Sequence, residues 1–239
     1  IPFWVEMSQH PNYDSYWQDR SLPKQMKNVQ CAVLTVGGFF DAEDMWGALN
    51  LYAATEKQNK SANNYLVMGP WYHGMWAGPS GKTFGDMDWG STTSTYFQDE
   101  IEAPFFEKFL RDQPVPEPPE ATMFDTGAHK WRAFPTWPPK KLRQSALYFG
   151  ARKTLTKDKS KVDGADTYVN NPLNPTPYTD PMPSRRNREY MLSNQKFASD
   201  RRDVLTYQTE PLAGDMVLAG PVIADLVVST TGTDADFIV

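Results

Sequence analysis

One continuous apolar run near the start of the chain constrains the fold more than any other feature. Residues 30–36 read Gln-Cys-Ala-Val-Leu-Thr-Val, and the run closes on Gly37-Gly38. Its length and its β-branched residues are typical of a strand that is buried on both faces of a parallel sheet. The run therefore indicates an α/β domain in this part of the chain.

The segments that follow repeat the alternation of an α/β sheet with helices on its faces. Residues 44–57 carry apolar residues at helical spacing, and residues 65–69 form a second short apolar strand that leads into a loop over 70–90. Residues 94–110 return to helical spacing, and a short helix is expected at 14–20. The expected apolar stripe of the 94–110 helix consists of Ile101, Phe105, Phe106 and Phe109.

From Pro114 onward the composition changes, which predicts a second domain. Twelve of the 20 prolines lie between Pro114 and Pro183, whereas all eight tryptophans lie at or before Trp137. Short apolar runs alternate with turn residues, as in an all-β sandwich, and residues 170–188 are expected to form a long irregular surface loop. The sequence thus predicts two domains, residues 1–113 and residues 114–239. The expected sandwich strands are Ala121–Phe124, Ser145–Phe149, Val204–Gln208, Asp215–Leu218 and Pro221–Ser229.

The charge balance and the rarity of metal-binding residues argue against several classes of protein. The 24 Lys and Arg against 29 Asp and Glu give a net charge of −5, so no basic excess attracts nucleic acid or a membrane surface. No run approaches the roughly 20 apolar residues of a membrane-spanning helix. A single cysteine, Cys31, and three histidines disfavour a disulfide framework and a metal cluster. We expect no metal and no cofactor.

The two ends of the chain suggest a fragment of something longer. The chain begins without Met, at Ile1-Pro2-Phe3-Trp4, and shows neither a basic region nor a cleavage site of a signal peptide. It stops at Asp236-Phe237-Ile238-Val239, which reads as the middle of a strand.

Two polar residues follow the predicted strands at the edge where α/β proteins carry their function. Asp41 comes just after the strand 30–36, and His73 comes just after the strand 65–69. An acid followed by a histidine on successive strand exits is half of the triad of an α/β-hydrolase, where the carboxylate orients the imidazole and the imidazole takes a proton from a nucleophile. The alternatives are that Asp41 caps a helix and that His73 only packs in its loop.

The nucleophile of such a triad is missing from the sequence. No Gly-x-Ser-x-Gly occurs, and Ser80 lies after His73, in the wrong order for this fold. Gly81-Lys82-Thr83 imitates a phosphate-binding loop, but the glycine required five residues earlier is Trp76. A serine upstream of Ile1 is the expectation if the chain is enzymatic.

Glu43 and Asp44 place two further carboxylates beside Asp41. Three acids in four residues repel one another unless a helix N-terminus or a cation compensates, and a helix dipole near Asp44 offsets about 0.3–1 kcal/mol per charge. Simple helix capping is one interpretation. The other is an anionic pocket that binds a substrate ammonium next to the scissile bond.

These residues resemble a known family. Gly37-Gly-Phe-Phe-Asp-Ala-Glu-Asp-Met-Trp-Gly47 and Met68-Gly-Pro-Trp-Tyr-His-Gly74 are similar to the α-amino acid ester hydrolases, within the wider group of cocaine esterase-like and X-Pro dipeptidyl-peptidase-like serine hydrolases. The resemblance implies the C-terminal part of an α/β-hydrolase domain followed by a truncated jelly-roll β-sandwich. Segments that also resemble this family are Phe105–Leu110, Met123–Arg132, Trp137–Pro139 and Val228–Phe237.

The resemblance also implies roles for the acidic residues and the histidine. Asp41 would be the triad acid, His73 the general base, and Glu43 and Asp44 two of the carboxylates that bind the α-ammonium of an ester or amide substrate. The implied reaction is acyl transfer through a serine ester, with β-lactam side chains among the acyl groups. His10 and His129 are interpreted as structural, and Trp71, Trp76 and Trp89 as core residues or as the wall of an acyl pocket.

Two alternatives stay open. One is a related hydrolase of different specificity, such as a glutaryl-cephalosporin acylase or an X-Pro dipeptidyl-peptidase, and the other is a fragment that serves only as a binding or assembly module. The expected partners are a small-molecule substrate, the missing N-terminal part of the same protein and further copies of the chain, with no nucleic acid and no membrane. The resemblance implies a periplasmic or secreted location, although no signal is visible.

Overall fold

The computed structural model describes residues 1–159, 164–185, 187–233 and 235–239. These residues form two compact units, each of which is described by itself. The first combines residues 1–135 with the described part of 163–206, and the second combines the described parts of 136–162 and 207–239. The predicted boundary between residues 113 and 114 does not coincide with this division and stays a prediction.

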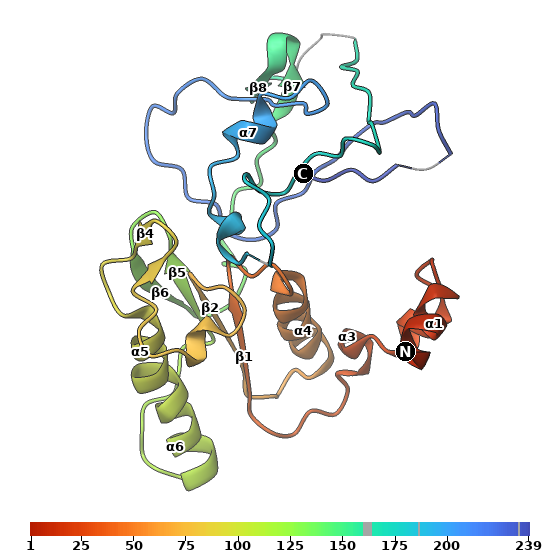
Figure 1. The fold of residues 1–239 in the computed structure, drawn as a ribbon. Helices are drawn as coiled ribbons and strands as arrows, with labels where there is room; N and C mark the ends of the chain where they lie inside the picture. The colour runs from red at the N-terminus through yellow and green to blue at the C-terminus, as the bar shows by residue number, and fades with distance from the viewer. Residues whose placement is uncertain (160–163, 186, 234) are drawn as a thin grey trace. The chain divides into compact units, whose positions relative to one another are not determined.

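A four-stranded mixed sheet forms the centre of the first unit, in the order β1-β2-β5-β6 (Figure 1). The first three strands run parallel, and β6 closes the sheet antiparallel to β5. Strand β2 lies between β1 and β5, and all six of its residues are buried, as the apolar run at 65–69 predicts. The strands are β1 (Val33–Gly38), β2 (Asn64–Gly69), β5 (Ala121–Asp125) and β6 (Lys130–Phe134).

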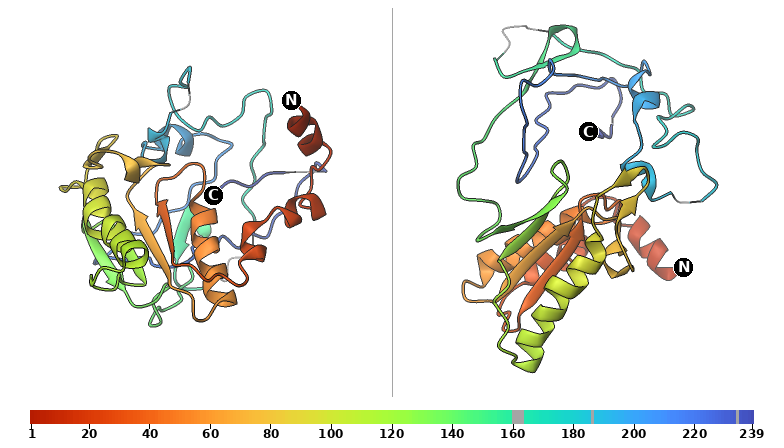
Figure 2. Two further views of the ribbon diagram at one scale, coloured as in Figure 1. Left: turned by 90° about the horizontal axis from the view of Figure 1, so that it is seen from below. Right: turned by 90° about the vertical axis from the view of Figure 1, so that its left-hand side faces the viewer.

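Helices cover the two faces of this sheet. Helix α4 lies against one face, and the long helix that begins with α5 lies against the other, as Figure 2 shows. The predicted order of strand, helix, strand, loop and helix is therefore confirmed. The α-helices of the unit are α1 (Pro2–Ser8), α2 (Ser15–Asp19), α3 (Leu22–Gln25), α4 (Met45–Gln58), α5 (Thr93–Phe97), α6 (Ala103–Arg111) and α7 (Lys196–Ser199).

The helix predicted over 94–110 contains one wide turn. Helices α5 and α6 are joined without a break by η2 (Gln98–Glu102), which is a π-helical turn. Pro104 lies two residues after the end of η2. A proline inside a helix has no N–H and crowds the carbonyl four residues earlier, so a wide turn accommodates it. The turn changes which residues share a face. Phe97, Ile101 and Phe105 are buried, whereas Phe106 is 46% exposed, so its predicted place in the apolar stripe is wrong.

The loop predicted over 70–90 contains short regular elements. It holds the 3₁₀ turn η1 (Met75–Ala77) and a two-stranded hairpin of β3 (Thr83–Phe84) and β4 (Met87–Asp88). The described part of residues 170–188 has no helix or strand, as predicted. A second 3₁₀ turn, η4 (Glu189–Met191), follows this irregular segment. Arg188 stacks on the ring of Tyr72, 4.9 Å from its centroid.

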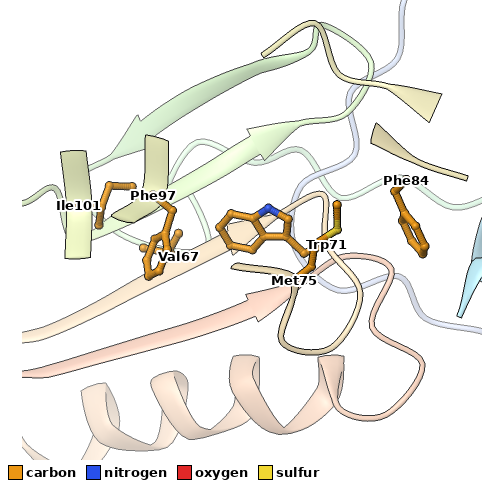
Figure 3. Packing of buried hydrophobic residues seen from close by; sticks show 6 residues of the cluster. All are labelled: Val67, Trp71, Met75, Phe84, Phe97 and Ile101. Carbon is orange, nitrogen blue, oxygen red and sulfur yellow. The ribbon is translucent and has the colours of Figure 1, made fainter. Parts of the chain in front are cut away.

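One cluster of buried side chains joins the sheet to the loop and to the long helix. Trp71 is fully buried in this cluster, and Figure 3 shows its indole with Phe97 and Val67 on one side and Phe84 on the other. Phe97 meets the Trp71 ring edge-on at 5.5 Å. The buried members of the cluster are Val67, Trp71, Met75, Phe84, Phe97 and Ile101.

The prediction that Ala121–Phe124 belongs to a separate sandwich is wrong in this structure. The segment is β5, and it pairs with β2 in the same sheet as β1. Its four residues are all buried. A strand with both faces apolar satisfies its backbone best between two neighbours, and β2 and β6 provide them.

In the described part of the second unit, one two-stranded hairpin is the main regular structure. Strands β7 (Tyr148–Gly150) and β8 (Thr154–Thr156) form a hairpin around η3 (Ala151–Lys153), and Gln208 makes one bridge to Thr154. The strands predicted at Asp215–Leu218 and Pro221–Ser229 are absent, and Val204–Gln208 contributes only that bridge. An apolar run becomes a strand only beside a partner edge, and Val222 and Ile223 remain 83% and 76% exposed. The jelly-roll assignment stays a prediction.

Candidate active site

The ends of strands β1 and β2 are tied together by backbone hydrogen bonds. Phe39 N donates to the carbonyl of Gly69 at 2.9 Å, and Phe40 N donates to that of Trp71 at 3.1 Å. Gly38 permits this approach, since a Cβ there would collide with the Trp71 carbonyl. The residues that leave the two strands are therefore held side by side at the carboxyl edge of the sheet.

Asp41 is buried at this edge, and both oxygens of its carboxylate are hydrogen-bonded. Its Oδ1 accepts from the backbone N–H groups of Glu43 at 2.7 Å and Asp44 at 3.1 Å, and its Oδ2 lies 2.9 Å from His73 Nδ1. The side chain is only 2% exposed, whereas that of His73 is 49% exposed. The structure thus brings together the two residues that the sequence proposed as acid and base.

The Asp41 carboxylate determines how the neutral imidazole of His73 holds its proton. An ionised carboxylate only accepts hydrogen bonds, so the proton is assigned to Nδ1 and the lone pair to Nε2. That is the tautomer a general base needs. The imidazole also packs at a steep angle against the Trp76 ring, with 5.9 Å between the ring centroids, so two side chains restrain its orientation.

Glu43 and Asp44 lie on the exposed turn that follows Asp41. Asp44 is the N-cap of α4, and its Oδ1 accepts from Gly47 N at 2.6 Å. This bond confirms the capping interpretation for Asp44. The second interpretation, ammonium binding by both carboxylates, is compatible with their exposure and stays a prediction.

The other residues that sequence reasoning singled out have structural contacts. Trp71 and Trp89 are buried in the core, and only Trp76 reaches the imidazole. His10 pairs with Asp14 at 2.7 Å and stacks on Tyr16, and His129 meets the ring of Trp89 edge-on at 5.5 Å. The sequence names Trp76 as a core or pocket-wall residue, and its contact with the His73 ring is the feature that spacing does not reveal.

The segment Gly81-Lys82-Thr83, which imitates a phosphate-binding loop, leads into the β3–β4 hairpin. Lys82 pairs with Asp88 at 2.8 Å, and this partner, together with the hydrogen bond from Gly90 N, holds the pKa of the Asp88 carboxyl below its usual range. Thr83 begins a strand, whereas a phosphate loop leads into a helix. The rejection of this motif is confirmed.

Within the described parts of the chain, three further features are absent. No serine, threonine or cysteine is hydrogen-bonded to His73. No group of three or more His, Cys, Asp and Glu is placed to hold a metal ion. No described helix is long and apolar enough to cross a membrane.

Comparisons with known proteins agree with this geometry. Residues 1–75 match the family described as X-Pro dipeptidyl-peptidase (S15 family), and residues 115–239 match the X-Pro dipeptidyl-peptidase C-terminal non-catalytic domain. The cocaine esterase of Rhodococcus sp. (strain MB1 Bresler) is 28% identical over 249 residues. That alignment covers 98% of this chain and 42% of the esterase, so the chain spans about two-fifths of this relative.

Two solved structures share the fold. An aminopeptidase from a marine sediment archaeon, Thaumarchaeota archaeon, has a TM-score of 0.81 and 30% identity, over 89% of this chain and 36% of that one. An α-amino acid ester hydrolase labelled with selenomethionine has a TM-score of 0.80 and 32% identity, over 89% and 37%.

Proposed function

Because this chain belongs to the X-Pro dipeptidyl-peptidase (S15) family, we propose that the complete gene product is a serine hydrolase whose triad acid and general base are Asp41 and His73. The observation that carries this proposal is the 2.9 Å hydrogen bond from His73 Nδ1 to the buried carboxylate of Asp41. A half-exposed imidazole held in one tautomer by a buried acid is the arrangement that activates a nucleophile.

The proposed reaction is acyl transfer in two steps. His73 Nε2 takes the proton of a serine hydroxyl, the serine oxygen attacks the carbonyl of an ester or amide, and the imidazolium returns the proton to the leaving group. Water then attacks the acyl-enzyme by the same route, or an amine takes its place. The serine is proposed to lie in the part of the gene product that the relatives have beyond the span of this chain.

A serine-directed phosphonate probe tests the triad. The probe labels a serine only when a general base activates it, so wild-type gene product is expected to react and His73→Asn to lose labelling at least a hundredfold. His129→Asn is the matched control, because His129 is exposed, contacts Trp89 and has a φ of 51°, which Asn tolerates. Equal labelling of His73→Asn and wild type would refute the assignment.

We further propose that Glu43 and Asp44 select substrates with an α-ammonium group. Both are exposed on the turn that leaves Asp41, within three residues of the acid. A cation about 4 Å from one exposed carboxylate gains about 1 kcal/mol in water and more where solvent is displaced. Two such carboxylates predict a preference for α-amino over plain acyl esters of about tenfold or more.

The matched test of this selectivity keeps the fold intact. The double variant Glu43→Gln, Asp44→Asn removes both charges, and Asn caps a helix as well as Asp, so α4 retains its cap. The expected result is a tenfold or greater loss in kcat/KM for α-amino esters with little change for plain esters. Asp112→Asn, which removes an exposed charge at the far end of α6, is the control. Unchanged selectivity in the double variant would contradict the proposal.

The same assay separates the alternative functions. A glutaryl acyl group carries a negative charge, which Glu43 and Asp44 repel, so a preference for glutaryl over aminoacyl substrates would favour the acylase alternative. A gene product that binds a ligand but hydrolyses neither class, and that the phosphonate probe does not label, would favour the binding-module alternative.

A further inference from the structure

One helix holds the loop that carries His73 through side-chain hydrogen bonds. The donors and acceptors lie on α5 and the first residue of η2, and their partners are the Trp71 indole and backbone carbonyls between Met75 and Gly81. The bonds are Trp71 Nε1 to Thr93 Oγ1 at 2.8 Å, Thr93 Oγ1 to Gly81 O at 2.7 Å, Ser94 Oγ to Met75 O at 2.8 Å, Thr95 Oγ1 to Pro79 O at 3.0 Å, and Gln98 Nε2 to Trp76 O at 2.7 Å and to Gly78 O at 2.8 Å.

We propose that Gln98 is a positioning residue for the general base His73 and that it acts through Trp76. The proposal rests on the proposed function for the role of His73, and it adds a residue to which no role in that function has been assigned. Gln98 does not touch the imidazole. It holds the backbone of the residue whose ring does.

The contact between Trp76 and His73 is the second restraint on the imidazole. The Asp41 hydrogen bond fixes the position of Nδ1 but leaves the ring free to tilt about that bond. The Trp76 indole meets the imidazole at 5.9 Å with an angle of 69° between the planes, and this contact limits the tilt. The direction in which Nε2 points therefore depends on where Trp76 lies.

Trp76 lies on a short turn whose own backbone hydrogen bonds leave the carbonyls of Trp76 and Gly78 to other partners. Turn η1 has three residues, and its backbone makes short i to i+3 hydrogen bonds, from Met75 N to Tyr72 O, from Ala77 N to Gly74 O and from Gly78 N to Met75 O. The carbonyls of Trp76 and Gly78 point toward α5, and the amide of Gln98 satisfies both with its two N–H groups. Without these bonds, two carbonyls on a half-buried turn lose their partners.

The π-helical turn accounts for the position of Gln98 beside the loop that carries His73. Gln98 is the first residue of η2, and Phe97 and Ile101 on either side of it point into the core beside Trp71. The wide turn ends two residues before Pro104 in the same helix. π turns inside α-helices are frequent at functional sites because they reposition side chains without ending the helix.

The chain offers a matched control for the removal of Gln98. Gln58, at the end of α4, also donates from one Nε2 to two carbonyls, those of Pro23 at 2.7 Å and Ala54 at 3.1 Å. It therefore loses the same number and kind of hydrogen bonds when it is replaced. Gln58 contacts α3 and its own helix, whereas Gln98 contacts the His73 loop.

The test compares Gln98→Met, Gln98→Lys and Gln58→Met in the complete gene product. Methionine keeps the length of the side chain and removes both donors, and lysine restores donors of similar reach. The readouts are kcat and KM for ester hydrolysis, the ¹⁵N chemical shifts of the His73 ring nitrogens, identified with His73→Asn, and unfolding in urea. Misplacement of a catalytic group by about 1 Å costs on the order of a hundredfold in rate.

The expected result for Gln98→Met is a 10- to 100-fold lower kcat with KM within twofold of wild type. The ¹⁵N chemical shifts of its His73 ring nitrogens are expected to change, Gln98→Lys to recover most of kcat, and Gln58→Met to retain wild-type kcat. Wild-type kcat and unchanged His73 chemical shifts in Gln98→Met would overturn the proposal, as would equal losses of kcat in Gln98→Met and Gln58→Met. If the wild type hydrolyses no ester, the proposed function fails, and these chemical shifts alone then decide whether Gln98 positions His73.

Discussion

The substitution Asp41→Asn gives the sharpest test of the acid–base pair, because the structure determines which way the new amide must face. Asp41 Oδ1 accepts from two backbone N–H groups, those of Glu43 and Asp44. An asparagine has one oxygen and one NH₂ group, and the NH₂ group cannot face two donors. Its oxygen must therefore take the place of Oδ1, and its NH₂ group must face His73 Nδ1.

This orientation forces His73 into the wrong tautomer. With a donor opposite Nδ1, the imidazole must present its lone pair there and carry its proton on Nε2, where it can no longer accept the proton of a serine. The expected loss in kcat is about 10³- to 10⁴-fold, as for tautomer reversal in serine hydrolases generally. That factor corresponds to about 4–5.5 kcal/mol of transition-state stabilisation.

Folding stability is expected to change far less than the rate. The asparagine has the shape of the aspartate and keeps both backbone hydrogen bonds of the turn, so a loss of about 1 kcal/mol is expected, from one weakened hydrogen bond. The assay combines steady-state ester hydrolysis, urea unfolding and ¹⁵N chemical shifts of the His73 ring nitrogens, which report the tautomer. An Asp41→Asn protein that retained more than a tenth of the wild-type kcat, or that kept the proton on Nδ1, would refute the reasoning.

Two further predictions concern stability. Burial, followed by the hydrogen bond to Glu117, raises the pKa of Tyr65 to about 12, so the stabilising contribution of Tyr65 is complete below pH 10 and is lost as the pH rises toward 12. Tyr65→Phe is therefore expected to flatten the decline in the free energy of unfolding between pH 10 and 12. Equal declines in the variant and the wild type would contradict this prediction. Gly38→Ala is expected to lower the melting temperature strongly and to weaken the Asp41–His73 hydrogen bond, because the new Cβ meets the Trp71 carbonyl that Phe40 N binds. Gly127→Ala, whose Cβ would have ordinary contacts, is the control, and equal melting temperatures for the two variants would show that the close approach at Gly38 is not required.

The first unit was predictable where periodicity and local signals agree. The apolar run at 30–36 contains β1, which begins at Val33 and is only partly buried, and the run at 65–69 forms the fully buried β2. The stripe between them forms α4, capped by Asp44. The prediction places β5 in the wrong sheet because its short run of Ala, Thr, Met and Phe identifies a strand but not its partner. The partner of a strand is decided by tertiary packing, here by the β2 edge that β1 leaves open.

The strands predicted after residue 200 show the complementary error. The run at 221–229 contains β-branched residues and alternation, yet its side chains remain exposed and no described segment pairs with it. β-propensity measures how well side chains pack on a pleated surface, so it has no effect on a segment that has no neighbouring strand. A sequence pattern can therefore indicate that a strand is possible without showing where its hydrogen bonds go.

The same distinction separates the parts of the site that spacing revealed from the part that it did not. Asp41 and His73 are accessible to sequence reasoning because the position directly after a parallel strand is fixed by the sheet, so two strand exits place two side chains together without further information.

Gln98 lies 25 residues after His73 on a helix, and nothing in the sequence around it distinguishes it from a surface glutamine. Its role arises from three features that only the folded chain brings together: the π turn near Pro104, the carbonyls of Trp76 and Gly78 that accept from its amide, and the Trp76 ring against the imidazole. The two residues at the strand exits therefore follow from topology, whereas the residue that we propose positions one of them follows from packing. Such a positioning residue has to be sought among buried or half-buried polar side chains that satisfy the backbone of a catalytic loop.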